Sequence, residues 1–223
     1  IRCAYVHEGA SLVGFTLTHG GGSRTWSDRG GGGALLESSG VLRDCMITGN
    51  SAVSGGGVMG GIVVRCTISH NATESRGGGA FQSKLFECII ADNVSSNDAA
   101  GAEQCTLHDC YIVGNAAGDY GCGGVRSCVL FNCVLTSNYA TDGNSNASRD
   151  SLLYNCTLTG NYSPGNGAYF ASSGDTFYNC IVYGNNPDGD AAWSNHDNSS
   201  VFYNSCTTPE PSQGEGNIST DPL

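Results

Sequence analysis

The feature that most constrains the fold is a cysteine that returns every 21 to 24 residues and is followed five positions later by an asparagine. An aliphatic residue also stands two positions after each cysteine, and an apolar residue stands three positions before it. Four columns that hold through seven repeats indicate a stack of similar structural units. The cysteines are Cys45, Cys66, Cys88, Cys110, Cys133, Cys156 and Cys180, and the asparagines are Asn50, Asn71, Asn93, Asn115, Asn138, Asn161 and Asn185.

Each repeat consists of short segments in which apolar and polar residues alternate, separated by glycine clusters such as residues 55–57 and 77–79. Such segments are typical of strands, and glycine-rich stretches form helices poorly, which disfavours a leucine-rich repeat of similar period. One repeat cannot bury its own apolar side, so the repeats must stack. We therefore predict an all-β, single-stranded, right-handed parallel β-helix of about nine coils over residues 1–206. Residues 207–223 lose the pattern, which favours an irregular C-terminal cap or a trimmed linker.

The two polar columns have structural interpretations. Asparagine tolerates left-handed backbone and can bond a copy of itself in the next coil, so we expect an asparagine ladder at a corner. The cysteines fit buried thiols or disulfides between stacked neighbours, whose Cα atoms would lie about 4.8 Å apart. Parallel Cβ vectors suit a disulfide poorly, so we favour thiols. Phe15 is expected to take the cysteine position in the first coil, and Cys206 to continue the column in the last.

Charge restricts the partners. The net charge is −11, and Lys84 is the single lysine, which argues against binding nucleic acid or an anionic membrane surface. The chain has no apolar run of 18 residues, so this segment is not expected to insert into a membrane. The cysteine spacing is a coil length and not a zinc-ligand spacing, so we expect no metal centre of that type. The first repeat begins incomplete at Ile1, which favours a piece of a longer protein.

The chain resembles the polymorphic outer-membrane protein repeat family, whose repeats alternate a Gly-Gly-Ala-Ile motif with a Phe-x-x-Asn motif. Matching pairs are Gly32-Gly33-Ala34 with Ile47-x-x-Asn50, and Gly78-Gly79-Ala80 with Ile90-x-x-Asn93. The resemblance covers about residues 10–206, and departs from the family in an aliphatic residue where the family has phenylalanine and in the cysteine column. It implies a secreted or surface-displayed bacterial β-helix of the adhesin or passenger type, and it transfers no catalytic residue.

Acidic residues in the turns after the asparagines give one candidate for catalysis. Asp98, Asp119 and Asp142 lie on successive coils and could converge. Glycoside hydrolysis needs two or three carboxylates around a groove, and the same acids with backbone carbonyls could hold calcium. Aspartate is also common in turns for backbone reasons alone. We expect no cofactor other than a possible calcium ion.

Large apolar residues at outward-facing positions give a second candidate, a contact surface. They are Phe86, Ile89, Tyr111, Phe131, Tyr154 and Tyr178. An apolar strip on a rod marks an interface, although such residues also stabilise strands for their own sake. The partner could be a second copy, joined end to end or laterally, or a glycan stacked on Tyr154 and Tyr178. The first hypothesis is therefore a non-catalytic structural rod, and the alternative is a carbohydrate-active enzyme or glycan-binding module.

Overall fold

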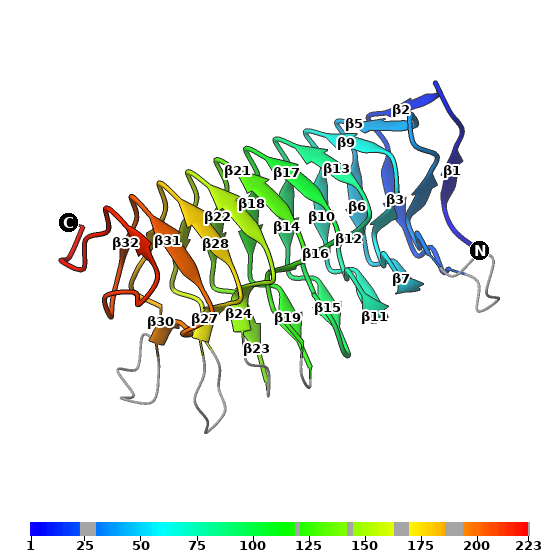
Figure 1. The fold of residues 1–223 in the computed structure, drawn as a ribbon. Coiled ribbons are helices and arrows are strands. Elements are labelled where there is room, and N and C mark those ends of the chain that lie inside the picture. The colour runs from blue at the N-terminus through cyan, green and yellow to red at the C-terminus, as the bar shows by residue number, and fades with distance from the viewer. Residues whose placement is uncertain (23–29, 119–120, 142–144, 163–169, 186–193, 223) are drawn as a thin grey trace.

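The computed structural model describes residues 1–22, 30–118, 121–141, 145–162, 170–185 and 194–222. These residues form an elongated stack of coils built from short strands, and none of them lies in a helix (Figure 1). Strands of neighbouring coils pair in parallel, as β10 (Thr67–Ser69) does with β14 (Ile89–Ala91). The predicted all-β parallel solenoid is confirmed.

The described strands form four sheets that run along the stack, here called A to D. Sheet A contains β1 (Ala4–Val6), β4 (Ala34–Leu36), β8 (Val58–Met59), β12 (Ala80–Phe81), β16 (Ala102–Glu103), β20 (Val125–Arg126), β24 (Ser145–Arg149), β27 (Phe170–Ser173) and β30 (Ser194–His196). Sheet B contains β2 (Ser11–Val13), β5 (Val41–Arg43), β9 (Ile62–Val64), β13 (Lys84–Phe86), β17 (Thr106–His108), β21 (Val129–Phe131), β25 (Leu152–Tyr154), β28 (Thr176–Tyr178), β31 (Val201–Tyr203) and β33 (Gly214–Glu215).

Sheet C contains β3 (Thr16–Thr18), β6 (Met46–Thr48), β10, β14, β18 (Tyr111–Val113), β22 (Val134–Thr136), β26 (Thr157–Thr159), β29 (Ile181–Val182) and β32 (Cys206–Thr207). Sheet D contains β7 (Ser51–Ser54), β11 (Ala72–Arg76), β15 (Val94–Ser95), β19 (Ala116–Ala117) and β23 (Tyr139–Ala140), and Figure 1 shows these strands along the lower side of the rod. Sheets A and C each contain nine described strands. Seven turns, one for each ladder cysteine, are regular, so the number of regular coils is slightly below the expected nine.

The core lies between sheets A, B and C. Sheets B and C each send one large aliphatic side chain inward per coil, such as Leu85 and Ile90, and both are fully buried. Sheet A sends inward mainly small residues, such as Ala80 and Ala102. All four belong to one continuous apolar cluster, because each coil buries its apolar side against the next.

The corners between sheets repeat one local design. A residue with positive φ follows most strands of sheets A, B and C, for example Gln82 (53°) at the A–B corner, Glu87 (53°) at the B–C corner and Asp92 (53°) at the C–D corner. The next residue in each case points its side chain inward, and these residues are Ser83, Cys88 and Asn93. The backbone N–H of that inward residue is satisfied by a side chain of the following coil and not by a strand partner, as in Ser83 N to Cys105 Sγ at 3.4 Å.

The cysteine column therefore supplies hydrogen-bond acceptors as well as apolar volume. The amides of Cys45, Cys133 and Cys156 donate to the sulfurs of the next coil at 3.3, 3.5 and 3.3 Å. All twelve cysteines are free thiols, and eleven of them are buried. Phe15 takes the corresponding position in the first coil and is 54% exposed. No coil precedes it among the described residues, so no backbone N–H of an earlier coil needs an acceptor there. The prediction that Cys206 continues the column is wrong. Ser205 takes the position and accepts from Cys180 N at 3.0 Å, because Cys206 already pairs with Ile181 in sheet C.

The expected asparagine ladder is confirmed at the C–D corner. Asn71 Nδ2 donates to Asn93 Oδ1 at 3.0 Å, and Asn93 Nδ2 donates to Asn115 Oδ1 at 2.9 Å. Each amide also binds backbone: Asn93 Oδ1 accepts from Asn71 N, and Asn93 Nδ2 donates to Ile68 O, both at 3.0 Å. The ladder continues in this way from Asn50 to Asn185, and Asn195 closes it by accepting from Asn185 Nδ2 at 2.9 Å.

The glycine pairs before sheet A let the chain cross this ladder at close range. A Cβ on Gly79 would lie 2.7 Å from the carbonyl oxygen of Gly101, 2.9 Å from a methyl group of Ile90 and 3.0 Å from Asn93 Nδ2. Gly57 has an equivalent environment one coil earlier, with Gly79 O at 2.6 Å. The glycines therefore provide space as well as ending strands.

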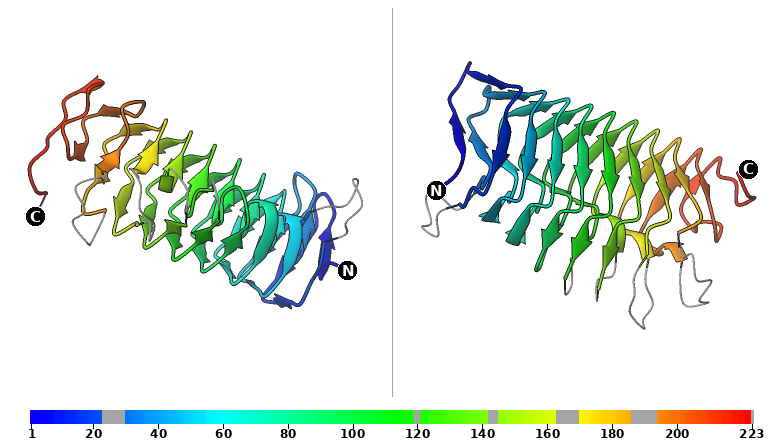
Figure 2. Two further views of the ribbon diagram at one scale, coloured as in Figure 1. Left: turned by 90° about the horizontal axis from the view of Figure 1, so that it is seen from below. Right: turned by 180° about the vertical axis from the view of Figure 1, so that it is seen from behind.

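The segment after residue 206 covers the last coil. Strand β33 pairs with β31, and Asn217 Oδ1 accepts from Ser205 N at 3.0 Å, which extends the acceptor column of the B–C corner by one step. Figure 2 shows the N- and C-termini at opposite ends of the rod. Residues 207–222 thus add ordered strand pairing to one end.

Candidate functional site

A cluster of charged side chains lies where sheet D leads into sheet A. The guanidinium of Arg126 contacts Asp98 Oδ1 directly, and Arg76 Nε lies 3.9 Å from both Asp98 Oδ2 and Glu103 Oε1. Asp150 extends the cluster, with its Oδ2 4.0 Å from Arg126 Nε. Residues from different coils meet here because β12, β16 and β20 are neighbours in sheet A.

Glu103 is the chemically distinctive member of this cluster. Its side chain is 5% exposed, and Oε2 accepts a hydrogen bond from Ala99 N at 3.4 Å. Burial, and secondly the nearby Asp98 carboxylate, raise the pKa of Glu103 to about 7. A carboxyl group whose pKa is raised to about 7 can give and take a proton near neutral pH, which general acid–base chemistry requires. Glu103 is not among the candidates predicted from the sequence. It stands at an outward position of β16, where a charged residue is ordinary, and its burial becomes visible only in the stacked coils.

The three acidic candidates have different outcomes. Asp98 is 24% exposed and is engaged by two arginines, so it stands in an ion-pair network. Asp119 and Asp142 lie outside the described residues, so their convergence with Asp98 and a calcium site built from the three acids stay predictions. Among the residues that the structure does describe, no group of three or more histidine, cysteine, aspartate or glutamate side chains could hold a metal ion.

The aromatic candidates lie on the outer face of sheet B. Phe86, Phe131, Tyr154 and Tyr178 form one continuous stack there, which His108 and Tyr203 complete. Successive ring centroids lie 5.1, 4.5, 5.1, 5.0 and 4.9 Å apart, at interplanar angles of 5° to 10°. Neighbouring rings cover the faces of Tyr154 and Tyr178, so a partner meets ring edges and hydroxyl groups. A sugar stacked on either ring face has no room in this arrangement.

The other two contact candidates face outward from sheet C, across the B–C corner from the ring stack. Ile89 is 46% exposed and Tyr111 is 43% exposed, and the two residues pair directly in the sheet. Met46 and Ile181 are further exposed members of this column, at 49% and 39%. The structure thus places the six predicted contact residues on two adjoining faces.

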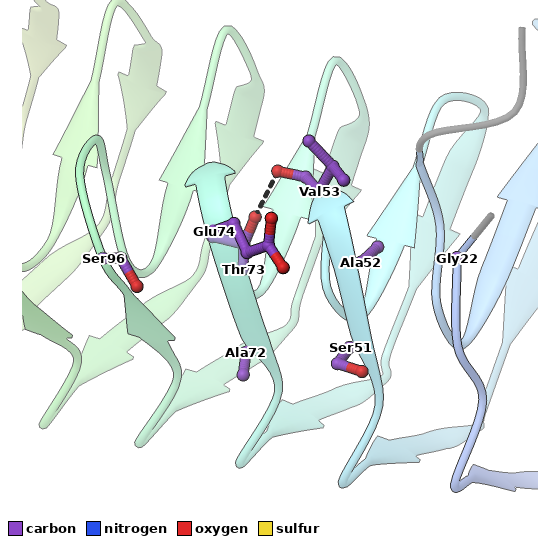
Figure 3. Close-up of a pocket in the computed structure, with 8 residues that line it drawn as sticks. All are labelled: Gly22, Ser51, Ala52, Val53, Ala72, Thr73, Glu74 and Ser96. Atoms are coloured by element: carbon purple, nitrogen blue, oxygen red, sulfur yellow. Dashed lines mark hydrogen bonds between the residues drawn. The ribbon is translucent and has the colours of Figure 1, made fainter. Parts of the chain in front are cut away.

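Sheet D carries a shallow hollow of about 250 Å³ between β7 and β15. Figure 3 shows its lining, in which Glu74 is the one charged side chain and Thr73 Oγ1 donates to Val53 O at 2.7 Å. The other lining residues are Gly22, Ser51, Ala52, Ala72 and Ser96. A shallow surface of small side chains and backbone, with one carboxylate, lacks the convergent polar groups of a catalytic pocket.

No helix among the described residues is long and apolar enough to span a bilayer.

Comparison with family models finds no match to this chain, and comparison with curated proteins finds none either. Membership of the polymorphic outer-membrane repeat family therefore stays a prediction. Among solved structures, the chain is similar to full-length QnrB1, described as a plasmid-mediated fluoroquinolone resistance protein, with 10% identity and a TM-score of 0.27 over 93% of this chain and 92% of that one. A likeness of that size supports no statement about function.

Proposed function

We propose that the chain is a non-catalytic structural rod, secreted or displayed on a bacterial cell surface, which acts by presenting its outer faces to a partner. The supporting observation is the pair of apolar columns on sheets B and C: the six-ring stack and the exposed Ile89 and Tyr111. Large apolar side chains that stay exposed along a rod, as Ile89 and Tyr111 do, are typical of an interface. The half-buried rings of sheet B adjoin them with their edges. The partner proposed first is a second copy, joined laterally.

Light scattering over a range of protein concentrations, with negative-stain microscopy, tests this proposal. The mean mass should rise with concentration, and Ile89→Thr with Tyr111→Thr should suppress the rise. Val94→Thr is the matched control, because Val94 is also 46% exposed but lies on sheet D. A strictly monomeric wild-type chain at every concentration, or equal effects of the sheet C and sheet D variants, would contradict lateral self-association.

The second candidate is a carbohydrate-active enzyme, which the raised pKa of Glu103 beside Asp98 supports. In that case Glu103 would act as the general acid. Release of new reducing ends from a panel of polysaccharides should then occur with the wild-type chain and be lost in Glu103→Gln. No release from any polysaccharide would leave the non-catalytic rod as the better account.

A further inference from the structure

The B–C corner changes character along the rod. Its left-handed positions are charged in the first coils, at Asp44, Arg65, Glu87 and Asp109, with φ from 48° to 54°. In the later coils the same positions are asparagines, at Asn132, Asn155, Asn179 and Asn204, with φ from 50° to 54°. The backbone therefore accepts several residue types here, of which asparagine is one that left-handed backbone favours, and the later coils share an exposed side-chain amide.

The exposed amides form a second, outer ladder. Asn132 Nδ2 donates to Asp109 Oδ1 at 3.1 Å, and Asn155 and Asn179 each donate to the preceding asparagine at 3.3 Å. Asn132 and Asn155 thus each use one N–H and one oxygen lone pair on their neighbours. An amide has two donors and two acceptor lone pairs, so one of each remains for a ligand. Hydroxyl groups, which both donate and accept, fit this pattern.

An aromatic side chain adjoins each amide in the sequence and on the surface. The segments Phe131-Asn132-Cys133, Tyr154-Asn155-Cys156 and Tyr178-Asn179-Cys180 repeat this pairing. Across these three coils, strand B, the corner and the start of strand C contain no charged residue, over residues 129–134, 152–157 and 176–181. In a chain with a net charge of −11, this is a neutral strip.

The amide row ends in a concavity. A hollow of about 340 Å³ lies between the corner and the C-terminal segment. Its lining includes Asn179 and Asn204 from the corner, Ile181 from sheet C, and Gly216, Ile218 and Pro222 from the C-terminal segment. The hollow is open to solvent and mostly apolar, with amide groups in its lining, so it can receive the end of a chain that lies along the corner.

We infer that the corner from Asn132 to Asn204 is a binding track for an uncharged polysaccharide chain, one end of which enters this hollow. Amide groups of Asn132, Asn155 and Asn179 bind sugar hydroxyls, and the edges of the neighbouring rings contact the less polar parts of the sugars. The inference rests on the proposed role as a rod that acts through its outer faces, and it adds a polysaccharide as a partner distinct from the second copy proposed above.

The dimensions of the strip favour a narrow chain over a globular partner. Three coil spacings separate Asn132 from Asn204 and give a length of about 14 Å, and a three-residue strand is about 10 Å long. The resulting area of about 140 Å² is far below the roughly 800 Å² per partner of a stable protein interface. A single extended polymer needs only such a strip. The neutral surface also imposes no charge on the ligand, whereas an acidic polymer would be repelled by the rest of the chain.

Affinity electrophoresis of the purified chain tests the inference. Native gels would contain a neutral polysaccharide (β-glucan, galactomannan or arabinoxylan) or an acidic one (polygalacturonate or alginate). We expect retardation by at least one neutral polymer and by neither acidic polymer. Mobility measured against polymer concentration gives a dissociation constant. Asn155→Asp and Asn179→Asp, each made singly, should raise that constant about tenfold or more, because each variant loses the free N–H and adds a charge to the strip.

The controls separate binding from folding. Asp109 already occupies the B–C corner and Asp92 the C–D corner, both in the left-handed conformation, so the variants keep a residue that the backbone accepts. Ser137→Asp adds the same charge at an exposed C–D corner position with φ 56°, and it should bind like the wild type. Retardation by acidic polymers, equal effects of Asn179→Asp and Ser137→Asp, or no retardation by any neutral polymer would overturn the inference. Self-association is measured separately by light scattering, so either proposal can fail without the other.

Discussion

At the scale of the residue, this fold requires a side-chain hydrogen-bond acceptor at each corner, because a buried backbone N–H there has no strand partner. The backbone N–H that follows a left-handed residue donates to a side chain of the following coil, as Ser83 N does to Cys105 Sγ. Cysteine, serine, asparagine and aspartate all meet this need: Cys128 N donates to Ser151 Oγ at 3.1 Å, and Ser151 N donates to Asp175 Oδ1 at 2.7 Å. The sulfur of cysteine is a weak acceptor, but it also fills apolar space.

Substitutions of Cys156 separate its acceptor role from its packing role. Serine keeps the acceptor for Cys133 N and should lower the free energy of unfolding by less than about 1 kcal/mol. Valine fills the space but leaves that buried amide without a partner, so it should cost about 1–3 kcal/mol. Urea denaturation measures both. A larger loss for serine than for valine would show that packing dominates at this position.

The columns themselves were predictable from the sequence, because a period of 21 to 24 residues in four columns has few structural solutions. The acceptor role of the cysteines was not, since the amide that each sulfur serves lies a whole coil earlier in the chain. The left-handed corner between sheets B and C was also not predictable at Arg65 and Glu87. Both residues have positive φ, but neither residue type is enriched in left-handed backbone.

At the scale of the element, the inner and outer asparagine rows have the same residue type and opposite environments. Asn93 is fully buried and makes bonds to Asn71, Ile68 and Asn115, whereas Asn132 is exposed and bonds two neighbours along the surface. The inner row therefore holds consecutive strands of sheets C and D in register.

Replacement of each asparagine by alanine should show this difference. Asn93→Ala leaves the amide groups of Asn71 and the carbonyl of Ile68 unsatisfied in the core, so the free energy of unfolding should fall by about 3 kcal/mol or more. Asn132→Ala should cost only about 1 kcal/mol, mostly from an alanine in left-handed backbone. Thermal or urea denaturation measures the pair. Equal losses would mean that the inner ladder is not a main source of stability.

Strand positions were predicted well, because alternation within each repeat fixes which residue points inward. For Gly57 and Gly79 the sequence predicted only one of two roles. Both were expected to break strands, while the short distances to the next coil and to the asparagine ladder become visible only once the coils are stacked.

At the scale of the whole molecule, two buried acids make the stability depend on pH. Burial raises the pKa of Asp175 well above its usual range, and its Oδ2 has no partner among the described residues. Burial also raises the pKa of Glu103 to about 7. Both groups stay protonated in the folded chain at pH values where the unfolded chain has already released the proton.

The sign of the pH effect follows from this difference. Stability is fully present below the unfolded pKa of about 4 and falls as the pH rises toward 7, because the unfolded state then binds fewer protons. At lower pH an opposing group appears: hydrogen bonds from three serines outweigh burial and lower the pKa of Asp197. We expect the melting temperature to fall between pH 5 and pH 7, and Glu103→Gln with Asp175→Asn to flatten that fall. A melting temperature that rises over this range would contradict the assignment.

The charged cluster could not be predicted because its members come from three coils, at Arg76, Glu103 and Arg126. No local motif joins them, and the period alone does not say which outward residues are close. The outer amide row was more accessible, since the aromatic-Asn-Cys triplet recurs in the printed sequence.

Across the seven ladder repeats, all the variation in repeat length falls on one side of the rod. From the inward residue of sheet B to the ladder asparagine the count is always eight residues, as from Leu85 to Asn93. From the asparagine to the inward residue of sheet A it grows from eight, Asn50 to Val58, to eleven, Asn161 to Ser172. Insertions made there lengthen one loop and leave the phase of every other coil unchanged. The side of the rod between the asparagine ladder and sheet A therefore tolerates insertions. New loops can evolve there, or an epitope can be grafted there, without a change to the core.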